Sequence, residues 1–167
     1  MLAKHYNLLY CDTGKIYRLL AKKIMQKKPK NKIKFLKKIS KKIDLKKLKS
    51  RSLLNNNVAY EASQIAKDLR VRKLVLKFQK NLAYNPPKKY NGSILDGRDI
   101  TSKVVTDAEF KFYITANTRV RAKRRYDELI KLGKKVKFDE ILNSIKKRDR
   151  EDRGRKHSKL KKTKDSI

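Results

Sequence analysis

The sequence predicts an α/β protein in which helices predominate over a few short parallel strands. Two apolar runs stop at polar loop residues: the run at 8–11 ends before Asp-Thr-Gly at 12–14, and the short run at 94–95 ends before Asp-Gly at 96–97. Such runs are typical of buried strands that lead into loops. Elsewhere, apolar residues recur at intervals of three and four, which is the period of an amphipathic helix. Ligands bind at the carboxyl ends of parallel strands, so we expect a site in these loops.

Helices are expected between the two runs. The first helix begins near Lys15, with Thr13 as its cap, and ends at Pro29. A basic amphipathic helix then covers about 33–43, and residues 55–83 form two further helices.

The second half of the sequence continues the alternation of strands and helices. A loop at 85–92 precedes the second strand, and a third strand is expected at 110–116. The next helix is capped by Asn117 and ends at Gly133, and a last helix starts at Phe138.

The composition indicates one folded domain with an extreme positive charge. The 167 residues include 49 Lys and Arg against 16 Asp and Glu, a formal net charge of +33, and 38% are hydrophobic. This positive charge would attract RNA, DNA and acidic membranes. Drift toward AT-rich codons also enriches lysine, so a functional and a purely compositional origin of the charge both stay open. The single cysteine excludes an internal disulfide and suits a reducing compartment. No apolar run approaches a membrane span and no signal peptide is visible, so we expect a cytoplasmic protein.

Lysine is most concentrated at residues 22–50, where Asp44 is the only acidic residue. Apolar residues at helical spacing indicate a helix there rather than a disordered tail. Its charge has two open interpretations: a solvated lysine-rich face over a modest core, or contact with nucleic acid or a membrane.

Carboxylates follow both predicted strands. Asp12, Asp96 and Asp99 could suggest a metal site, but a loop carboxylate more often caps a helix or pairs with an arginine. We therefore expect no metal site, and we expect Asp12 to cap the helix that follows it. Cys11 is expected to be a small core residue rather than a nucleophile.

Several groups of residues, in order and at family-like spacing, resemble the bacterial cytidylate kinase family, the (d)CMP kinases. They are Asp-Thr-Gly-Lys-Ile-Tyr-Arg at 12–18, Ala-Ser-Gln-Ile-Ala at 62–66 with Val-Arg at 71–72, Asp-Gly-Arg-Asp at 96–99, Thr-Asp-Ala-Glu-Phe-Lys at 106–111, Arg-Ala-Lys-Arg-Arg at 121–125, and the arginine-rich stretch at 148–155. The resemblance covers roughly residues 2–167. It implies a P-loop nucleotide kinase fold, a parallel sheet flanked by helices. It also implies a single domain at 1–167, a reduced lysine-rich nucleotide-binding insertion at 22–52 and a lid at 148–158.

The resemblance implies how the acceptor nucleotide is held. Arg18 and Arg98 would contact its phosphate, while Ser63 and Arg72 would read the cytosine edge. Arginines suit this chemistry, because phosphoryl transfer needs two positioned phosphates and neutralisation of the charge on the transferred group.

Other implied roles concern the sugar and the lid. Asp99 and Arg148 would hold the sugar with Asp152 nearby, and Arg153 and Arg155 would close over the triphosphate. The implied catalytic residues are therefore Arg98, Arg148, Arg153 and Arg155, and the implied substrate-binding residues are Asp12, Tyr17, Arg18, Ser63, Arg72, Arg98, Asp99, Arg148 and Asp152.

The sequence departs from the family pattern on the side of the phosphate donor. Family members open with a strand and a glycine-rich P-loop ending in Gly-Lys-Ser/Thr, which cradles the donor phosphates. These residues contain no such segment, since Gly14-Lys15 is followed by Ile16. The resemblance also places the start of the family's last strand near residues 165–167. We therefore expect a truncated sheet that lacks the central P-loop strand and the last strand, with at most three short parallel strands and poor stability.

The leading hypothesis is a monomeric nucleoside monophosphate kinase that transfers the γ-phosphoryl group of ATP, with Mg²⁺, to CMP or dCMP. The sequence would then be a fragment, or would start at the wrong codon. The alternative is a catalytically inactive relative that binds nucleotide or RNA through its basic surface. A P-loop encoded in frame upstream of Met1 would favour the first. We expect negligible kinase activity from these 167 residues alone, because the donor cradle and its lysine are missing.

Overall fold

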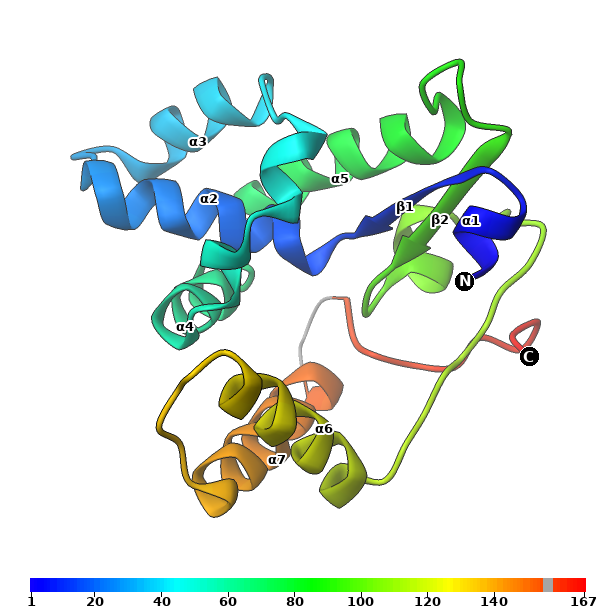
Figure 1. Ribbon diagram of the computed structural model, residues 1–167. Coiled ribbons are helices and arrows are strands. Elements are labelled where there is room, and N and C mark those ends of the chain that lie inside the picture. The colour runs from blue at the N-terminus through cyan, green and yellow to red at the C-terminus, as the bar shows by residue number, and fades with distance from the viewer. Residues whose placement is uncertain (155–157) are drawn as a thin grey trace. The chain divides into compact units, whose positions relative to one another are not determined.

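The computed structural model describes residues 1–154 and 158–167 and is dominated by helices, with one small parallel sheet (Figure 1). It divides into two compact units, Met1–Ile100 (unit 1) and Thr101–Ile167 (unit 2), which are described separately. The described residues form two strands, which agrees with the expectation of at most three short parallel strands. No helix in the described part of the chain is long and apolar enough to cross a membrane.

The sheet of unit 1 consists of β1 (Leu8–Asp12) and β2 (Gly92–Asp96), and both match predicted strands. They pair in parallel, with Leu8 opposite Gly92 and Asp12 opposite Asp96. Because the two strands end together, the loops that follow them start at the same edge of the sheet.

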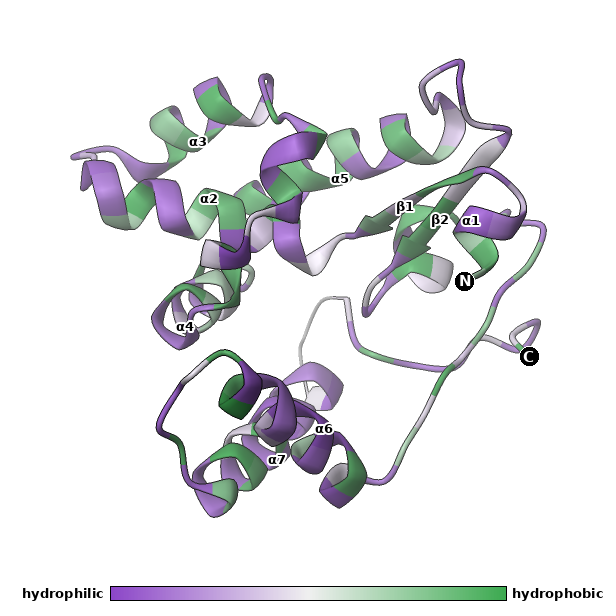
Figure 2. Cartoon of the chain, viewed as in Figure 1, coloured by the Kyte–Doolittle hydropathy of each residue, from purple (hydrophilic) through white to green (hydrophobic). Residues whose placement is uncertain are grey.

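The helices of unit 1 agree with the periodicity of the sequence. Purple and green alternate along them in Figure 2, and the apolar sides of the helices that follow β1 pack into one core. Ile16, Leu20, Leu36 and Val75 are each at most 1% exposed in that core. The elements are α1 (Leu2–His5), α2 (Gly14–Lys27), α3 (Lys32–Ser40), the 3-10 turns η1 (Leu45–Lys49) and η2 (Arg51–Leu54), α4 (Asn56–Ile65) and α5 (Leu69–Tyr84).

The start of α2 differs from the prediction in one respect, because Thr13 does not cap the helix with its side chain. Its backbone is already helical, at φ −68° and ψ −20°, whereas a capping residue has an extended backbone that aims its side chain at the first turn. The Thr13 hydroxyl instead donates to the carbonyl oxygen of Asp96, at 2.8 Å. Asp12 provides the cap as predicted, since its carboxylate accepts from the N–H of Gly14 at 3.0 Å.

Unit 2 is built around two helices. The side chain of Asn117 accepts a hydrogen bond from the N–H of Arg119, which confirms the predicted cap of the first helix. Gly133 follows that helix with φ 68°, a backbone conformation that favours glycine. The helices are α6 (Thr118–Lys131) and α7 (Phe138–Gly154), and a π-helical turn at Ile100–Val104 precedes them in the sequence.

The predicted strand at 110–116 is wrong, because these residues have no strand assignment. Phe110, Phe112 and Ile114 are 68%, 55% and 91% exposed, so their alternating apolar pattern is not buried. A strand needs a neighbouring strand to complete its hydrogen bonds. Within the described residues, the backbone partner at this segment is the single residue Ile167, which bonds to Lys111 and Tyr113 at 2.9 and 2.8 Å.

Candidate functional site

The carboxyl edge of the sheet is tied directly to the start of α2. Both the N–H and the hydroxyl group of Thr13 donate to the carbonyl oxygen of Asp96, at 2.9 and 2.8 Å. A side chain at Gly97 would not fit beside this contact, because its Cβ would lie 2.4 Å from the Thr13 hydroxyl oxygen. The two loops that leave the sheet are therefore held against each other, as a site at this edge requires.

Two ionisable side chains of β1 remain neutral at physiological pH. Partial burial, helped by the charges of Asp96 and Asp12, raises the pKa of Tyr10 to about 12. The Tyr10 hydroxyl donates to the Asp96 carboxylate at 3.3 Å. Burial raises the pKa of the Cys11 thiol to about 11, with Asp12 adding to the effect. Because Cys11 is buried and protonated, it is a core residue, as predicted, and not a nucleophile.

Arg72, Asp99 and Tyr17 form the clearest cluster of predicted site residues (the Arg72 cluster). The guanidinium group of Arg72 donates to the Asp99 carboxylate at 3.1 Å, and each side chain is 13% exposed. The same guanidinium lies over the Tyr17 ring, 5.9 Å from its centre, where the ring attracts a cation. These residues come from α5, the loop after β2, and α2, so the fold of unit 1 brings three distant segments to one place.

Arg18 follows Tyr17 on α2 and donates to the carbonyl oxygen of Leu53 at 2.9 Å. One turn later, the Lys22 ammonium group contacts the Ser52 hydroxyl at 2.6 Å. Basic residues of α2 thus attach η2 to this helix. That Arg18 contacts the phosphate of the acceptor nucleotide remains a prediction.

Arg98 and Ser63 also lie in unit 1, and both are partly exposed. The Ser63 hydroxyl donates to the carbonyl oxygen of Tyr60 in the preceding turn of α4, at 2.7 Å. Oxygen lone pairs of that hydroxyl can still accept hydrogen bonds. The phosphate and base roles of Arg98 and Ser63 remain predictions.

The remaining predicted site residues belong to unit 2. Arg148, Asp152 and Arg153 lie on the last turns of α7, and Asp152 is 1% exposed. The Arg148 guanidinium lies 3.8 Å from the Asp152 carboxylate. Residues 148–154 are helical, and the assignment of 148–158 as a lid remains a prediction. Arg155 lies outside the described residues.

The sequence did not reveal the partner of Arg121, which was known only as part of a basic cluster. Its guanidinium binds both carboxylate oxygens of Asp149, at 2.9 and 2.6 Å, and also the Ala116 carbonyl and the Thr118 hydroxyl. The ion pair raises the pKa of Arg121 further. This pair joins α6 to the turn of α7 that carries Arg148. Local sequence patterns do not predict this contact, because the two residues are 28 positions apart.

The described residues contain no group of three or more His, Cys, Asp or Glu side chains placed to hold a metal ion. Asp12 and Asp96 face each other across the sheet, but each already takes part in the contacts given above.

Comparison with known proteins assigns the family. A model of the family described as cytidylate kinase matches residues 1–167. The chain belongs to the cytidylate kinase family. The cytidylate kinase of Bartonella tribocorum is 40% identical over 165 residues, which cover 96% of this chain and 73% of that protein. The cytidylate kinases of Bartonella henselae and Mesorhizobium japonicum are 38% and 37% identical, with 99% and 96% of this chain and 76% and 73% of those proteins covered.

Membership in the cytidylate kinase family confirms the resemblance on which the fold was predicted, and with it the class of nucleoside monophosphate kinases. The helix-dominated structure with a small parallel sheet is consistent with this family.

Proposed function

We propose that this cytidylate kinase binds CMP or dCMP in unit 1 and presents its phosphate as the acceptor of a phosphoryl group from ATP. In that reaction a phosphate oxygen of the monophosphate attacks the γ-phosphorus of ATP. The bond between the γ-phosphorus and the β,γ-bridging oxygen breaks, and ADP and CDP or dCDP are released. The protein contributes mainly by positioning and by neutralising charge, which is the usual division of labour in phosphoryl transfer.

The pairing of Arg72 with Asp99 is the observation that carries the proposal. It places a hydrogen-bond donor and an acceptor side by side, 3.1 Å apart and mostly buried. Cytosine presents the complementary pair, a ring nitrogen that accepts and an amino group that donates, and carboxylates are suited to that amino group. Uracil presents the reverse order, so it would leave both protein groups without partners at a buried site, which is costly.

Asp99 was assigned to the sugar by resemblance, and its contact with Arg72 supports a role at the base as well. The two roles are separable, because CMP and dCMP share the base and differ in the sugar. Arg18 and Arg98 are the proposed contacts of the acceptor phosphate, since both guanidinium groups lie in the same unit as the Arg72 cluster.

ATP and Mg²⁺ enter the proposal as the phosphate donor and its metal ion, as the family implies. The 167 residues contain no glycine-rich segment of the P-loop pattern. The proposed donor contacts are therefore the lid arginines Arg153 and Arg155, which the family resemblance places over the triphosphate. The residues of unit 1 fit the acceptor only.

Calorimetric titration with CMP, dCMP and UMP tests the proposal. The wild-type chain should bind CMP at least about tenfold more tightly than UMP, since one matched or mismatched pair is worth about 1–3 kcal/mol. Asp99→Asn should reduce this preference to roughly threefold or less, because an amide can also donate to uracil. Arg70→Gln is the control, since Arg70 lies on α5 near Arg72 but forms an exposed pair with Asp68. Equal affinity of the wild type for CMP and UMP, or an unchanged preference in Asp99→Asn, would overturn the proposal.

A further inference from the structure

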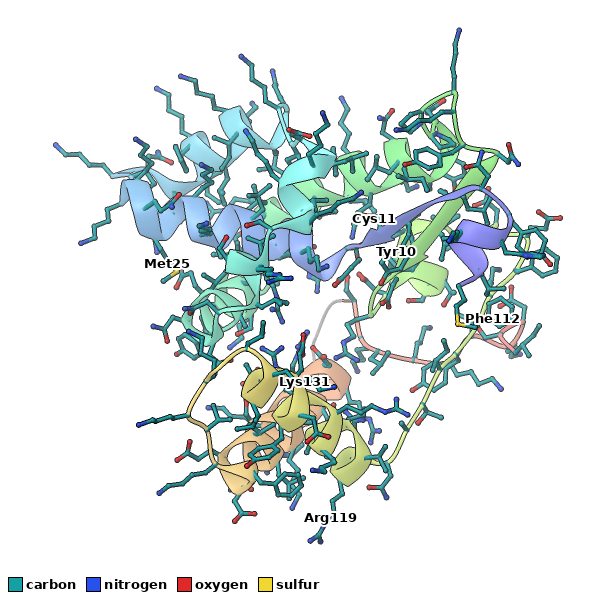
Figure 3. The ribbon with its side chains drawn as sticks, viewed as in Figure 1. Tyr10, Cys11, Met25, Phe112, Arg119 and Lys131 are labelled. Atoms are coloured by element: carbon teal, nitrogen blue, oxygen red, sulfur yellow. The ribbon has the colours of Figure 1, made fainter. Side chains whose placement is uncertain are left out.

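A lysine-rich surface covers the end of α2, α3 and η1 in unit 1 (the lysine surface). Fourteen lysines and one acidic residue, Asp44, lie between residues 22 and 49, and twelve of these lysines are exposed. In Figure 3, long side chains that end in nitrogen project outward from α2 and α3. This surface is separate in sequence from the Arg72 cluster, and the proposed function does not use it.

The fold holds these lysines in place. Ile24, Leu36 and Leu48, one from each of the three elements, are buried in the core of unit 1 at 4%, 1% and 6% exposure. The exposed lysines at 34, 37 and 38 of α3 and at its C-cap, residue 41, have spacings of three and four, so they share the face opposite the buried Leu36. The surface is therefore a row of charges on a folded helix and not a disordered basic tail.

The charge of the lysine surface is not neutralised within unit 1. Among the described residues, the carboxylate within ion-pair distance of these lysines is Glu61, which lies 3.8 Å from Lys32. Asp44 uses a carboxylate oxygen to accept from the N–H of Lys46 and so caps η1. Placing so many like charges together raises the free energy of the folded chain, and a bound polyanion would relieve that repulsion.

The chemistry of the surface favours one kind of polyanion. Phe35 is the single aromatic residue between 22 and 49, and it packs against the core, so the surface offers no ring on which bases could stack. Met25 is the exposed large apolar side chain of this segment, at 40%, which is too little to anchor a helix in a bilayer. Lysine ammonium groups contact phosphates as point charges and do not read base edges in pairs.

We propose that the lysine surface binds the phosphate backbone of double-stranded nucleic acid, independently of base sequence. Charges spaced by one helical turn can meet successive phosphates along a strand. Binding should release counterions and weaken steeply with salt, with a slope set by the number of lysines in contact.

Fluorescence anisotropy with a labelled 20-base-pair RNA duplex, and with the DNA duplex of the same sequence, tests this proposal. The first variant replaces four lysines with glutamine: those at 34, 37 and 38 on the outer face of α3, and the one at its C-cap, residue 41. Its affinity for both duplexes should fall by at least about tenfold at about 100 mM salt. The slope of log affinity against log salt should become shallower by about 3–4.

The matched control replaces four exposed lysines elsewhere in unit 1, at 73, 77, 80 and 88, with glutamine. It changes the net charge by the same amount as the first variant. If the duplex binds at the lysine surface, the affinity of this control should fall by less than about threefold. Equal losses in both variants would overturn the proposal, because binding would then follow total charge alone. Tighter binding of the wild type to anionic lipid vesicles than to the duplexes would also overturn it. Circular dichroism of both variants checks that α3 and α5 remain folded.

Discussion

Unit 1 buries a continuous cluster of fifteen residues, most of them large and apolar, whereas the apolar cluster of unit 2 contains three buried residues, Ala122, Leu129 and Ile141. In unit 2, ion pairs lie at two structural junctions: Arg121 with Asp149 between its helices, and Lys111 with Asp165 near its C-terminal end. Unit 1 has the Arg72–Asp99 pair in addition to its large core. Ion pairs weaken as salt screens their charges and as pH titrates them, whereas burial of apolar surface involves no charge to screen or titrate. Core truncations, losses of ion pairs, and changes of salt and pH should therefore affect the stability of the two units to different extents.

The largest effect should come from truncating the core of unit 1. Leu20→Ala should lower the free energy of unfolding by about 3–5 kcal/mol, because Leu20 is 1% exposed and its truncation leaves a cavity in the large core of unit 1. Leu129→Ala in unit 2 should cost only about 2 kcal/mol, since its cluster is small and more open. Urea unfolding followed by circular dichroism measures both variants. Equal losses would show that the units do not differ in this way.

Breaking the interhelical ion pair of unit 2 should have the next largest effect. Asp149→Asn should cost about 1–3 kcal/mol, because Arg121 would lose a bidentate partner at a site where Asp149 is 17% exposed. The control is Asp127→Asn, which breaks an exposed pair with Lys123 on α6 and should cost less than about 0.5 kcal/mol. The same urea titrations at low and high salt provide the measurement. A cost for Asp149→Asn as small as that of the control would contradict this account of unit 2.

A smaller effect should appear in unit 1 at alkaline pH. Burial raises the pKa of Cys11 from 9.0 to about 11, so the folded state keeps the proton while the unfolded state releases it. The protonated Cys11 thiol therefore contributes to the free energy of unfolding in full below pH 9. This contribution, on the order of 1–2 kcal/mol, is lost as pH rises toward about 11. Urea unfolding at several pH values in this window measures it. Cys11→Ala should flatten the pH dependence, and an unchanged dependence in that variant would rule out the thiol as its source.

The features that the sequence predicted correctly are those that depend on neighbours along the chain. β1 and β2 follow from short apolar runs that stop at aspartate, and α6 follows from the Asn117 cap and from Gly133. The burial of Cys11 follows from its place in the first of those runs. In each case, local backbone preference and the packing of the fold agree.

The features that the sequence could not predict depend on residues that meet only in the folded chain. Thr13 has the chemistry of a helix cap, but its contact with Asp96, which lies 83 positions away, determined its role. The segment at 110–116 has the pattern of a strand, yet strand formation also requires a neighbouring strand, which a local pattern does not reveal. Arg72 and Asp99 were both predicted as site residues, but their direct pairing was not.

The central claim is that unit 1 carries a cytosine-specific acceptor site at the Arg72 cluster. Hydrogen–deuterium exchange of the wild-type chain, alone and with saturating CMP or UMP, tests it most directly. CMP should slow amide exchange in the first turns of α2 and α5 and in the loop at 97–99, which surround Tyr17, Arg72 and Asp99. UMP at the same concentration should give little protection there. Equal protection by both nucleotides, or CMP protection confined to unit 2, would contradict the claim.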